Sequence, residues 1–176
     1  GHKTTPPAPA GTAPGVPQVL LMNLPLAQNE ADPAPRLHAA VYADPWSGTY
    51  AILRSPGSTG FETVTSAGAP ATLFEVLDAV GTGPLGRWDH AAILHVRVLE
   101  GEFESLEDML VFEGRNAVAV ATAGGGHEIV QFRQADLIAA DEWRLTGLLR
   151  GQLGTDGEMV SGIEAGALGV LIDEAV

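Results

Sequence analysis

Carboxylates close together in the sequence are the first residues that could do chemistry. Five acidic side chains, at positions 100, 102, 104, 107 and 108, fall within one short stretch. Two acids that face each other across a cleft at a set separation could cleave a glycosidic bond. The spacing of these five indicates no such cleft. We therefore favour a simpler interpretation, in which the acids hydrate a loop and stabilise the start of a helix electrostatically.

Aromatic side chains suggest a second chemistry, the binding of a sugar. A tryptophan ring beside a carboxylate could stack on a sugar and leave the carboxylate to bind its hydroxyl groups, and the candidate residues are Trp46, Trp88 and Asp89. Burial in a core is the commoner role of aromatic side chains. Exposed, coplanar rings at positions 46 and 88 would favour a glycan or partner contact, and burial of both rings would argue against a glycan.

Two weaker motifs predict neither a nucleotide site nor a metal site. Residues 81–86 match GxGxxG, but Pro84 lacks an N–H donor and no helix is expected to follow and bind a pyrophosphate. His90 and His95 are five residues apart on one expected strand, so they would point to opposite faces. We expect no cofactor, no metal and no catalytic residues in this chain, which is not predicted to be an enzyme.

The net charge and the composition argue against several classes of partner. Nine basic residues against 22 acidic residues give a formal charge of −13, which repels phosphate, so we expect no stable nucleic-acid binding. We expect no membrane insertion, because no apolar run is long enough to span a bilayer and no signal-peptide pattern occurs. The absence of cysteine excludes disulfides and thiolate chemistry.

The sequence divides into two parts of different composition. Gly1 and His2 in place of an initiating methionine indicate a tag remnant on a piece of a longer protein, and the Pro- and Ala-rich residues that follow indicate a linker. We assign residues 1–17 to this remnant and linker. Residues 18–176 are assigned to one β-rich module, which is long enough to bury a sizeable core.

Residues 143–155 are the stretch around which this module is expected to be organised. A strand with apolar side chains on both faces leads into a turn, where Gly151 and Gly154 allow positive φ. Arg150 at the strand end can donate N–H groups to carbonyls or to a carboxylate and so brace the turn. Because no nucleophile and base lie nearby, we interpret Arg150, Gly151 and Gly154 as a structural corner.

Alternation and turn residues predict a mainly β fold. Strict alternation along the central strand places Leu145 and Leu149 on one face and Leu148 with Arg150 on the other. The remaining expected strands are residues 19–24, 38–43, 49–54, 61–65, 90–99, 117–121, 128–132, 135–138 and 168–172. About ten short strands separated by Gly and Pro predict an antiparallel β-barrel or sandwich with one short helix.

Three local predictions are more specific. Residues 38–43 and 49–54 are expected to form a hairpin across the turn at residues 44–48. Residues 72–80 fit either a helical stripe or a short strand. Residues 106–112 predict the one short helix, with Ser105 as its N-cap and Gly114 just after its end.

Several segments, taken in order, carry a resemblance to a known family. They are residues 23–26 (NLPL), 45–48 (PWSG), 88–89 (WD), 114–117 (GRNA), 128–132 (EIVQF) and 148–155 (LLRGQLGT), of which the last two are the most specific. Through them, the sequence from Pro17 onward resembles the C-terminal region of the large tail-tip protein of gene transfer agents and related siphophages. This host-specificity or megatron protein is a relative of phage tail hub proteins.

The resemblance implies a non-enzymatic structural module at the tail tip of a particle that delivers DNA. It implies synthesis in the bacterial cytoplasm, contacts with other tail and baseplate proteins, a homotrimer in the particle and a part in host attachment. Leu153 stands where the family leads us to expect a basic residue, which affects one surface contact. The alternative, from another functional class, is a carbohydrate-binding module that recognises a cell-surface glycan.

Overall fold

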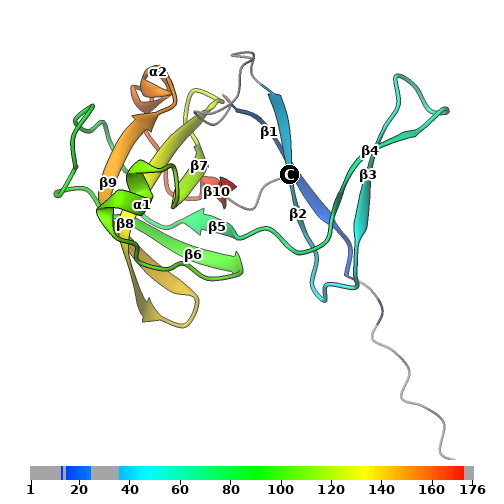
Figure 1. The fold of residues 1–176 in the computed structure, drawn as a ribbon, viewed down its shortest axis with the longest axis horizontal. Coiled ribbons are helices and arrows are strands. Elements are labelled where there is room, and N and C mark those ends of the chain that lie inside the picture. The colour runs from blue at the N-terminus through cyan, green and yellow to red at the C-terminus, as the bar shows by residue number, and fades with distance from the viewer. Residues whose placement is uncertain (1–12, 14, 25–35, 173–176) are drawn as a thin grey trace, which may run out of the picture.

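The fold is mainly β, as the alternation predicts. The computed structural model describes residues 13, 15–24 and 36–172, and within them it contains ten strands and two short helices. Six strands close into an antiparallel barrel, and four form two separate hairpins (Figure 1). Of the two predicted architectures, the barrel is therefore confirmed and the sandwich is not found.

The ten strands and two helices are numbered in the order in which they follow one another along the chain. The four hairpin strands are β1 (Gln18–Leu24), β2 (Arg36–Tyr42), β3 (Tyr50–Arg54) and β4 (Glu62–Ala67). The six barrel strands are β5 (Leu73–Val76), β6 (Leu94–Glu100), β7 (Ala117–Ala121), β8 (His127–Ala139), β9 (Glu142–Gln152) and β10 (Leu168–Leu171). The helices are α1 (Asp108–Phe112) and α2 (Asp156–Met159). Around the barrel the order is β10-β5-β6-β9-β8-β7.

The barrel core forms where each strand turns an apolar face inward. On β6, Leu94, Val96 and Val98 are buried while Arg97 is exposed, which is the alternation expected for this strand. These valines and leucine pack in one cluster with rings from neighbouring segments, Phe74, Phe103 and Phe132. On β10, a Cβ at Gly169 would overlap the ring of Phe74, so the seam between β10 and β5 needs a glycine there.

Strict alternation fails at one point of β9. Leu145 and Leu148 are three residues apart, yet both belong to the barrel core. Between them Gly147 has a φ of +63°, a left-handed conformation that an L-residue rarely adopts and that changes the face to which later side chains point. The prediction that Leu145 and Leu149 lie on one face of the strand is therefore wrong. Arg150, two residues after the core residue Leu148, lies on the same face of β9 as Leu148.

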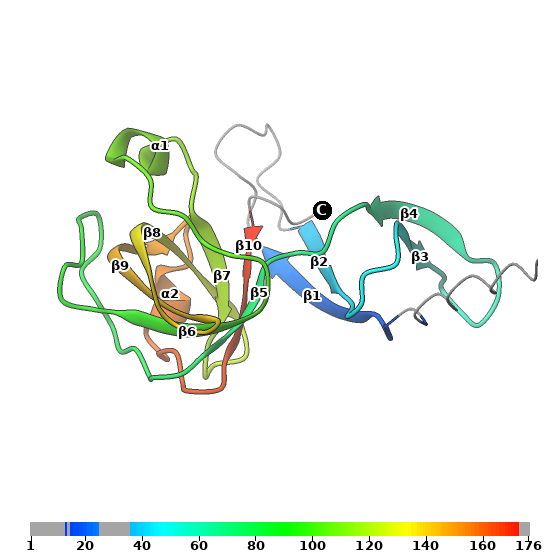
Figure 2. The same ribbon diagram turned by 90° about the horizontal axis from the view of Figure 1, so that it is seen from below.

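The hairpin β1–β2 packs against the outside of the barrel. Met22 and Leu24 of β1 and Ala40 of β2 form a second apolar cluster, which includes Leu73 of β5 and Val170 of β10. Figure 2 shows this hairpin beside β5 and β10, with the hairpin β3–β4 farther from the barrel.

The predicted hairpin of residues 38–43 with 49–54 is wrong, because β2 pairs with β1 and β3 pairs with β4. The turn residues at positions 44–48 favoured pairing of β2 with β3. The structure pairs β2 with β1 instead, because the apolar faces of these two strands cover the barrel together.

Residues 73–76 form a strand, which is the second of the two alternatives predicted for residues 72–80.

The short helices differ from the prediction. Helix α1 begins at Asp108 and its N-cap residue is Glu107, without a side-chain capping bond. Ser105 instead accepts a hydrogen bond from the Ala135 amide at 2.9 Å, so it joins the loop to β8. Helix α2 was not predicted.

Some predictions fall outside the described part of the chain. They concern most of the remnant and linker at residues 1–17. The ranges 128–132 and 135–138, expected as two strands, form the single long strand β8.

Candidate functional site

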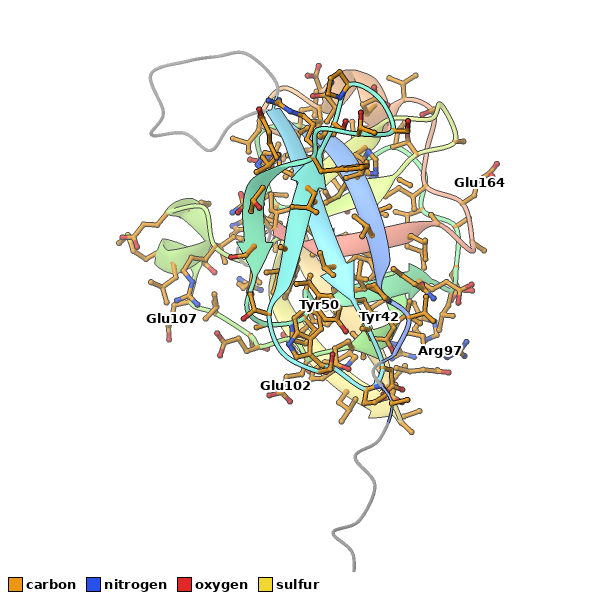
Figure 3. The ribbon with its side chains drawn as sticks, turned by 90° about the vertical axis from the view of Figure 1, so that its right-hand side faces the viewer. Tyr42, Tyr50, Arg97, Glu102, Glu107 and Glu164 are labelled. Carbon is orange, nitrogen blue, oxygen red and sulfur yellow. The ribbon has the colours of Figure 1, made fainter. Side chains whose placement is uncertain are left out.

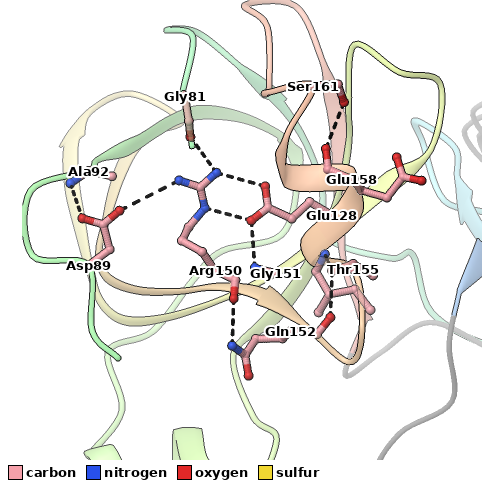
Figure 4. Close-up of polar contacts among 11 residues, drawn as sticks. Gly81, Asp89, Ala92, Glu128, Arg150, Gly151, Gln152, Thr155, Glu158 and Ser161 are labelled. Atoms are coloured by element: carbon pink, nitrogen blue, oxygen red, sulfur yellow. Dashed lines mark hydrogen bonds and ion pairs between the residues drawn. The ribbon is translucent and has the colours of Figure 1, made fainter. Parts of the chain in front are cut away.

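A buried ion pair joins β8 to β9 (Figure 4). The Arg150 guanidinium donates from Nε to Oε1 of Glu128 at 2.8 Å and from Nη2 to Oε2 at 3.0 Å. Neither side chain is exposed to solvent. The Gly151 amide donates a further hydrogen bond to Oε1 at 2.9 Å. The bidentate geometry and the extra donor satisfy the carboxylate on both oxygens, which a buried charge requires.

The same guanidinium holds the loop between β5 and β6. Its Nη2 also donates to the Gly81 carbonyl at 2.9 Å. Its Nη1 lies 3.9 Å from Oδ2 of Asp89, which is itself buried. Leu148 on β9 exchanges two backbone hydrogen bonds with Asp89, at 2.7 and 3.0 Å. Arg150 therefore fastens the loop to the end of β9 through two separate points of the loop.

Asp89 also orders the chain that follows it. Its Oδ1 accepts hydrogen bonds from the amides of Ala91 and Ala92, at 3.1 and 3.0 Å. Figure 4 shows the bond from Ala92. The carboxylate thus has one oxygen hydrogen-bonded to backbone amides and the other in an ion pair with Arg150 at 3.9 Å, which is too long for a hydrogen bond.

The GxGxxG segment has a packing role in this arrangement. A Cβ on Gly83 would lie 2.6 Å from Oδ2 of Asp89 and 3.1 Å from Cγ of Arg150. Only a glycine lets the backbone come so close to the two charged side chains. The next regular element after the loop is the strand β6, so there is no adjoining helix N-terminus for a phosphate group.

The end of β9 and the turn after it contain three residues in the left-handed region. Gly151, Leu153 and Gly154 have φ values of 55°, 54° and 77°. A Cβ on Gly151 would also lie 2.8 Å from the backbone of Asp156, whereas nothing lies near that position at Gly154. Thr155 closes the turn, because its hydroxyl donates to the Gln152 carbonyl at 2.7 Å and accepts the Ile129 amide at 2.9 Å. The turn is thereby tied to β8.

The residues proposed for sugar contact do not meet in one place. Trp46 lies in the connection between β2 and β3, half-buried, and its ring contacts Tyr50 edge-on with centroids 4.7 Å apart. Trp88 lies in the β5–β6 loop, which is on the opposite side of the molecule (Figures 1 and 2). Asp89 is buried and its carboxylate is occupied. The three residues therefore do not form one aromatic and acidic surface.

A different set of side chains surrounds Trp88. The ring of Phe112 in α1 lies 5.4 Å from the Trp88 ring, and the Arg133 guanidinium lies 5.5 Å above the Trp88 ring as a cation–π contact. Met109 of α1 is exposed one turn before Phe112. We call these four residues, Trp88, Met109, Phe112 and Arg133, the Trp88 patch. A shallow hollow lined by Pro84, Arg87, Trp88 and His90 adjoins it.

Three titratable residues of the barrel strands have shifted pKa values, and one of them is Arg97, whose pKa is raised by its hydrogen bond to Glu142. Burial lowers the pKa of His127 on β8, and the nearby carboxylate of Glu158 partly opposes this. A hydrogen bond from Arg97, at 2.8 Å, lowers the pKa of Glu142 on β9.

Among the residues that the structure describes, no cluster of three His, Asp or Glu side chains is suited to a metal ion. In that same part of the chain, no helix has the length and apolarity needed to cross a bilayer.

Sequence reasoning missed the partner of Arg150 and most of the Trp88 patch. Glu128 gave one usable signal, an acid inside the apolar run HEIVQF, where a charge needs a buried partner. Phe112 and Met109 gave none, because they fit the apolar stripe of a short helix and only the structure shows them exposed.

A sequence profile of the family described as "Rcc01698-like, C-terminal" matches residues 71–170. This is more than half of the 176-residue chain. The chain belongs to this family. The match begins just before β5 and ends within β10, so it covers the barrel except for the last residue of β10, and it includes the Arg150–Glu128 pair and the Trp88 patch. The hairpins β1–β2 and β3–β4 lie outside it. No curated protein matches the chain.

Proposed function

We propose that this chain is a structural module of a phage-like tail-tip protein, acting in particle assembly, host attachment and DNA delivery. The observation that carries the proposal is the family match, which coincides with one closed barrel. In the particle the module would contact other tail and baseplate proteins and form part of a homotrimer. It would act through its shape, without enzymatic activity.

The two most specific segments of the resemblance support this proposal by their place in the fold. Residues 128–132 lie on β8, and residues 148–155 run from β9 into the turn. One segment contributes Glu128 and the other Arg150, so together they build the buried ion pair. A sequence signature that maintains a fixed loop and turn suits a protein whose role is structural.

The charge distribution fits a surface that DNA passes without binding. Residues 71–172, which contain the barrel, carry sixteen Asp and Glu against six Arg. Such an acidic surface repels the phosphates of a duplex, so a component of the delivery path would let DNA slide past it.

Glycan binding, the alternative function, has less support in the geometry. It would require an open aromatic face next to a free carboxylate. The β2–β3 connection, which contains Trp46, and the β5–β6 loop, which contains Trp88, lie on different sides of the molecule (Figure 1). The carboxylate of Asp89 already binds two amides and pairs with Arg150. We therefore propose assembly rather than sugar recognition as the function.

The test is to locate the protein in purified particles. An epitope inserted in the exposed residues 56–60, between β3 and β4, leaves the barrel untouched and can be labelled with gold-conjugated antibody for electron microscopy. We expect gold at the tail tip and no gold on particles without the epitope. Gold on the head or along the tail shaft, or particles that lack the protein, would contradict the proposal.

A further inference from the structure

We propose that the Trp88 patch is a docking site for a segment of a partner protein that combines apolar and basic side chains. This inference rests on the proposed function and deepens it, because it assigns one contact with another particle protein to a defined surface.

The exposed side chains of α1 are not needed to hold the helix in place. Met109 and Phe112 are 70% and 58% exposed and, three residues apart, lie on one side of the helix. Val111 between them is fully buried and anchors the helix. Gln131 of β8 adds a hydrogen bond from Nε2 to the Val111 carbonyl at 2.6 Å. Two large apolar side chains thus face solvent where polar ones would fold equally well, as at interaction sites.

The patch is organised before any partner arrives. The Trp88 ring contacts both the Phe112 ring, at 5.4 Å, and the Arg133 guanidinium, at 5.5 Å. Arg133 is oriented in turn by Asp108, with Nη1 to Oδ1 at 3.4 Å. These contacts restrain Trp88, Phe112 and Arg133, so the three side chains have less conformational entropy to lose when a partner binds. Trp, Phe, Met and Arg are also the residue types enriched in protein interfaces.

The rim of the patch is acidic. Glu107 and Glu113 flank α1 and are exposed, and no ion pair to either is present among the described residues. Figure 3 places Glu107 beside α1 on the outer side of the molecule. Of the nearby arginines, Arg133 pairs with Asp108 and Arg115 pairs with Glu104, while Arg87 in the adjoining hollow has no ion pair among the described residues. The two unpaired carboxylates beside α1 outnumber this one unpaired cation. An apolar centre with an uncompensated acidic rim selects a partner segment that carries Lys or Arg beside its apolar side chains.

The experiment measures binding of short fluorescein-labelled peptides to the 176-residue chain by fluorescence anisotropy. The probes are a peptide of Leu and Phe with Lys and Arg, a peptide in which Glu replaces the basic residues, and a peptide in which Ser replaces the apolar residues. We expect binding of the first peptide only. Met109→Ser and Phe112→Ser should each weaken it by roughly tenfold or more, since both remove apolar contact at the centre.

Val160→Ser is the matched control, because Val160 is an exposed apolar residue at the end of α2, away from the patch. It should bind the peptide as the unchanged chain does. Circular dichroism verifies that each variant is folded.

Three outcomes would overturn the docking site: no binding of the first peptide, equal binding of the acidic or the Ser peptide, or unchanged binding by folded Met109→Ser and Phe112→Ser variants. Binding of soluble oligosaccharides that depends on Trp88 and competes with the peptide would assign the patch to a glycan instead. Gold at the tail tip together with any of these results would overturn the docking site alone, and the proposed function would stand.

Discussion

Arg150 and Glu128 form a bidentate ion pair in which neither side chain reaches solvent. Removing two charges from water costs several kcal/mol for each ion, and only good geometry with additional hydrogen bonds offsets that cost. Here the Gly151 amide and the Gly81 carbonyl supply those bonds. The pair therefore links β8, β9 and the β5–β6 loop, and loss of either partner would leave the other buried and uncompensated.

Arg150→Met should destabilise the protein by about 3–5 kcal/mol, because it leaves the Glu128 carboxylate buried without its partner. The free energy of unfolding is measured by urea titration. Adding Glu128→Gln to this variant should recover part of the loss. Arg97→Gln, which breaks an exposed ion pair with Glu142, is the control and should have a much smaller effect. Equal losses for the two arginines would contradict the role assigned to Arg150.

Gly83→Ala should destabilise the protein by about 1–3 kcal/mol through overpacking, because the new methyl group would lie 2.6 Å from Oδ2 of Asp89. Gly81→Ala is the matched control from the same motif. No atom lies within 4 Å of its added methyl group, and its carbonyl still accepts the Arg150 bond. Unfolding in urea compares the two variants. A Gly81 variant as unstable as the Gly83 variant would show that backbone freedom, not packing, explains the motif.

Met22→Ala should destabilise the protein by about 2–5 kcal/mol, because Met22 is 1% exposed and packs hairpin β1–β2 onto the barrel. Its neighbour Leu21 points to the other face and is 55% exposed, so Leu21→Ala should change stability by no more than about 0.5 kcal/mol. Thermal unfolding followed by circular dichroism measures both. If Met22→Ala leaves the main transition unchanged, the hairpin is not part of the barrel's folding unit.

Stability should fall as the pH decreases below about 6.5, the ordinary pKa of histidine. Burial lowers the pKa of His127 in the folded protein, so the unfolded chain takes up the proton first. The contribution of His127 to the stability of the folded protein is fully present above the pKa that this histidine has in the unfolded chain. It is lost as the pH falls from that value through the lower pKa in the folded protein. Melting temperatures across this range test the idea. His127→Gln should flatten the profile, and His90→Gln, at an exposed position, should keep the wild-type slope.

The barrel strands could be predicted largely from local pattern, and the pairing of the hairpins could not. Alternation along β6 marks its buried face, because successive side chains of any strand point to opposite sides. The partner of β2 depends on which apolar face covers the outside of β5 and β10, which involves residues far away in the sequence. The turn after β2 therefore favoured the wrong neighbour.

The corner around Arg150 shows the same division at a single site. A strand-end arginine before two glycines indicates a braced turn, and that much follows from residue types. The identity of its carboxylate partner required the structure, because Glu128 lies on another strand and Gly147 shifts the alternation between Leu145 and Arg150. Strict counting by twos cannot detect a left-handed residue inside a strand.

The sequence by itself determined a mainly β, acidic, cysteine-free chain with a short helix and a glycine-rich corner, because composition and alternation are properties of neighbouring residues. Only the tertiary structure decided that the sheet closes into a barrel, that Glu128 is the partner of Arg150, and that Trp88 meets Phe112 while Trp46 lies elsewhere. These facts depend on contacts between residues far apart along the chain. They form only when the whole core packs.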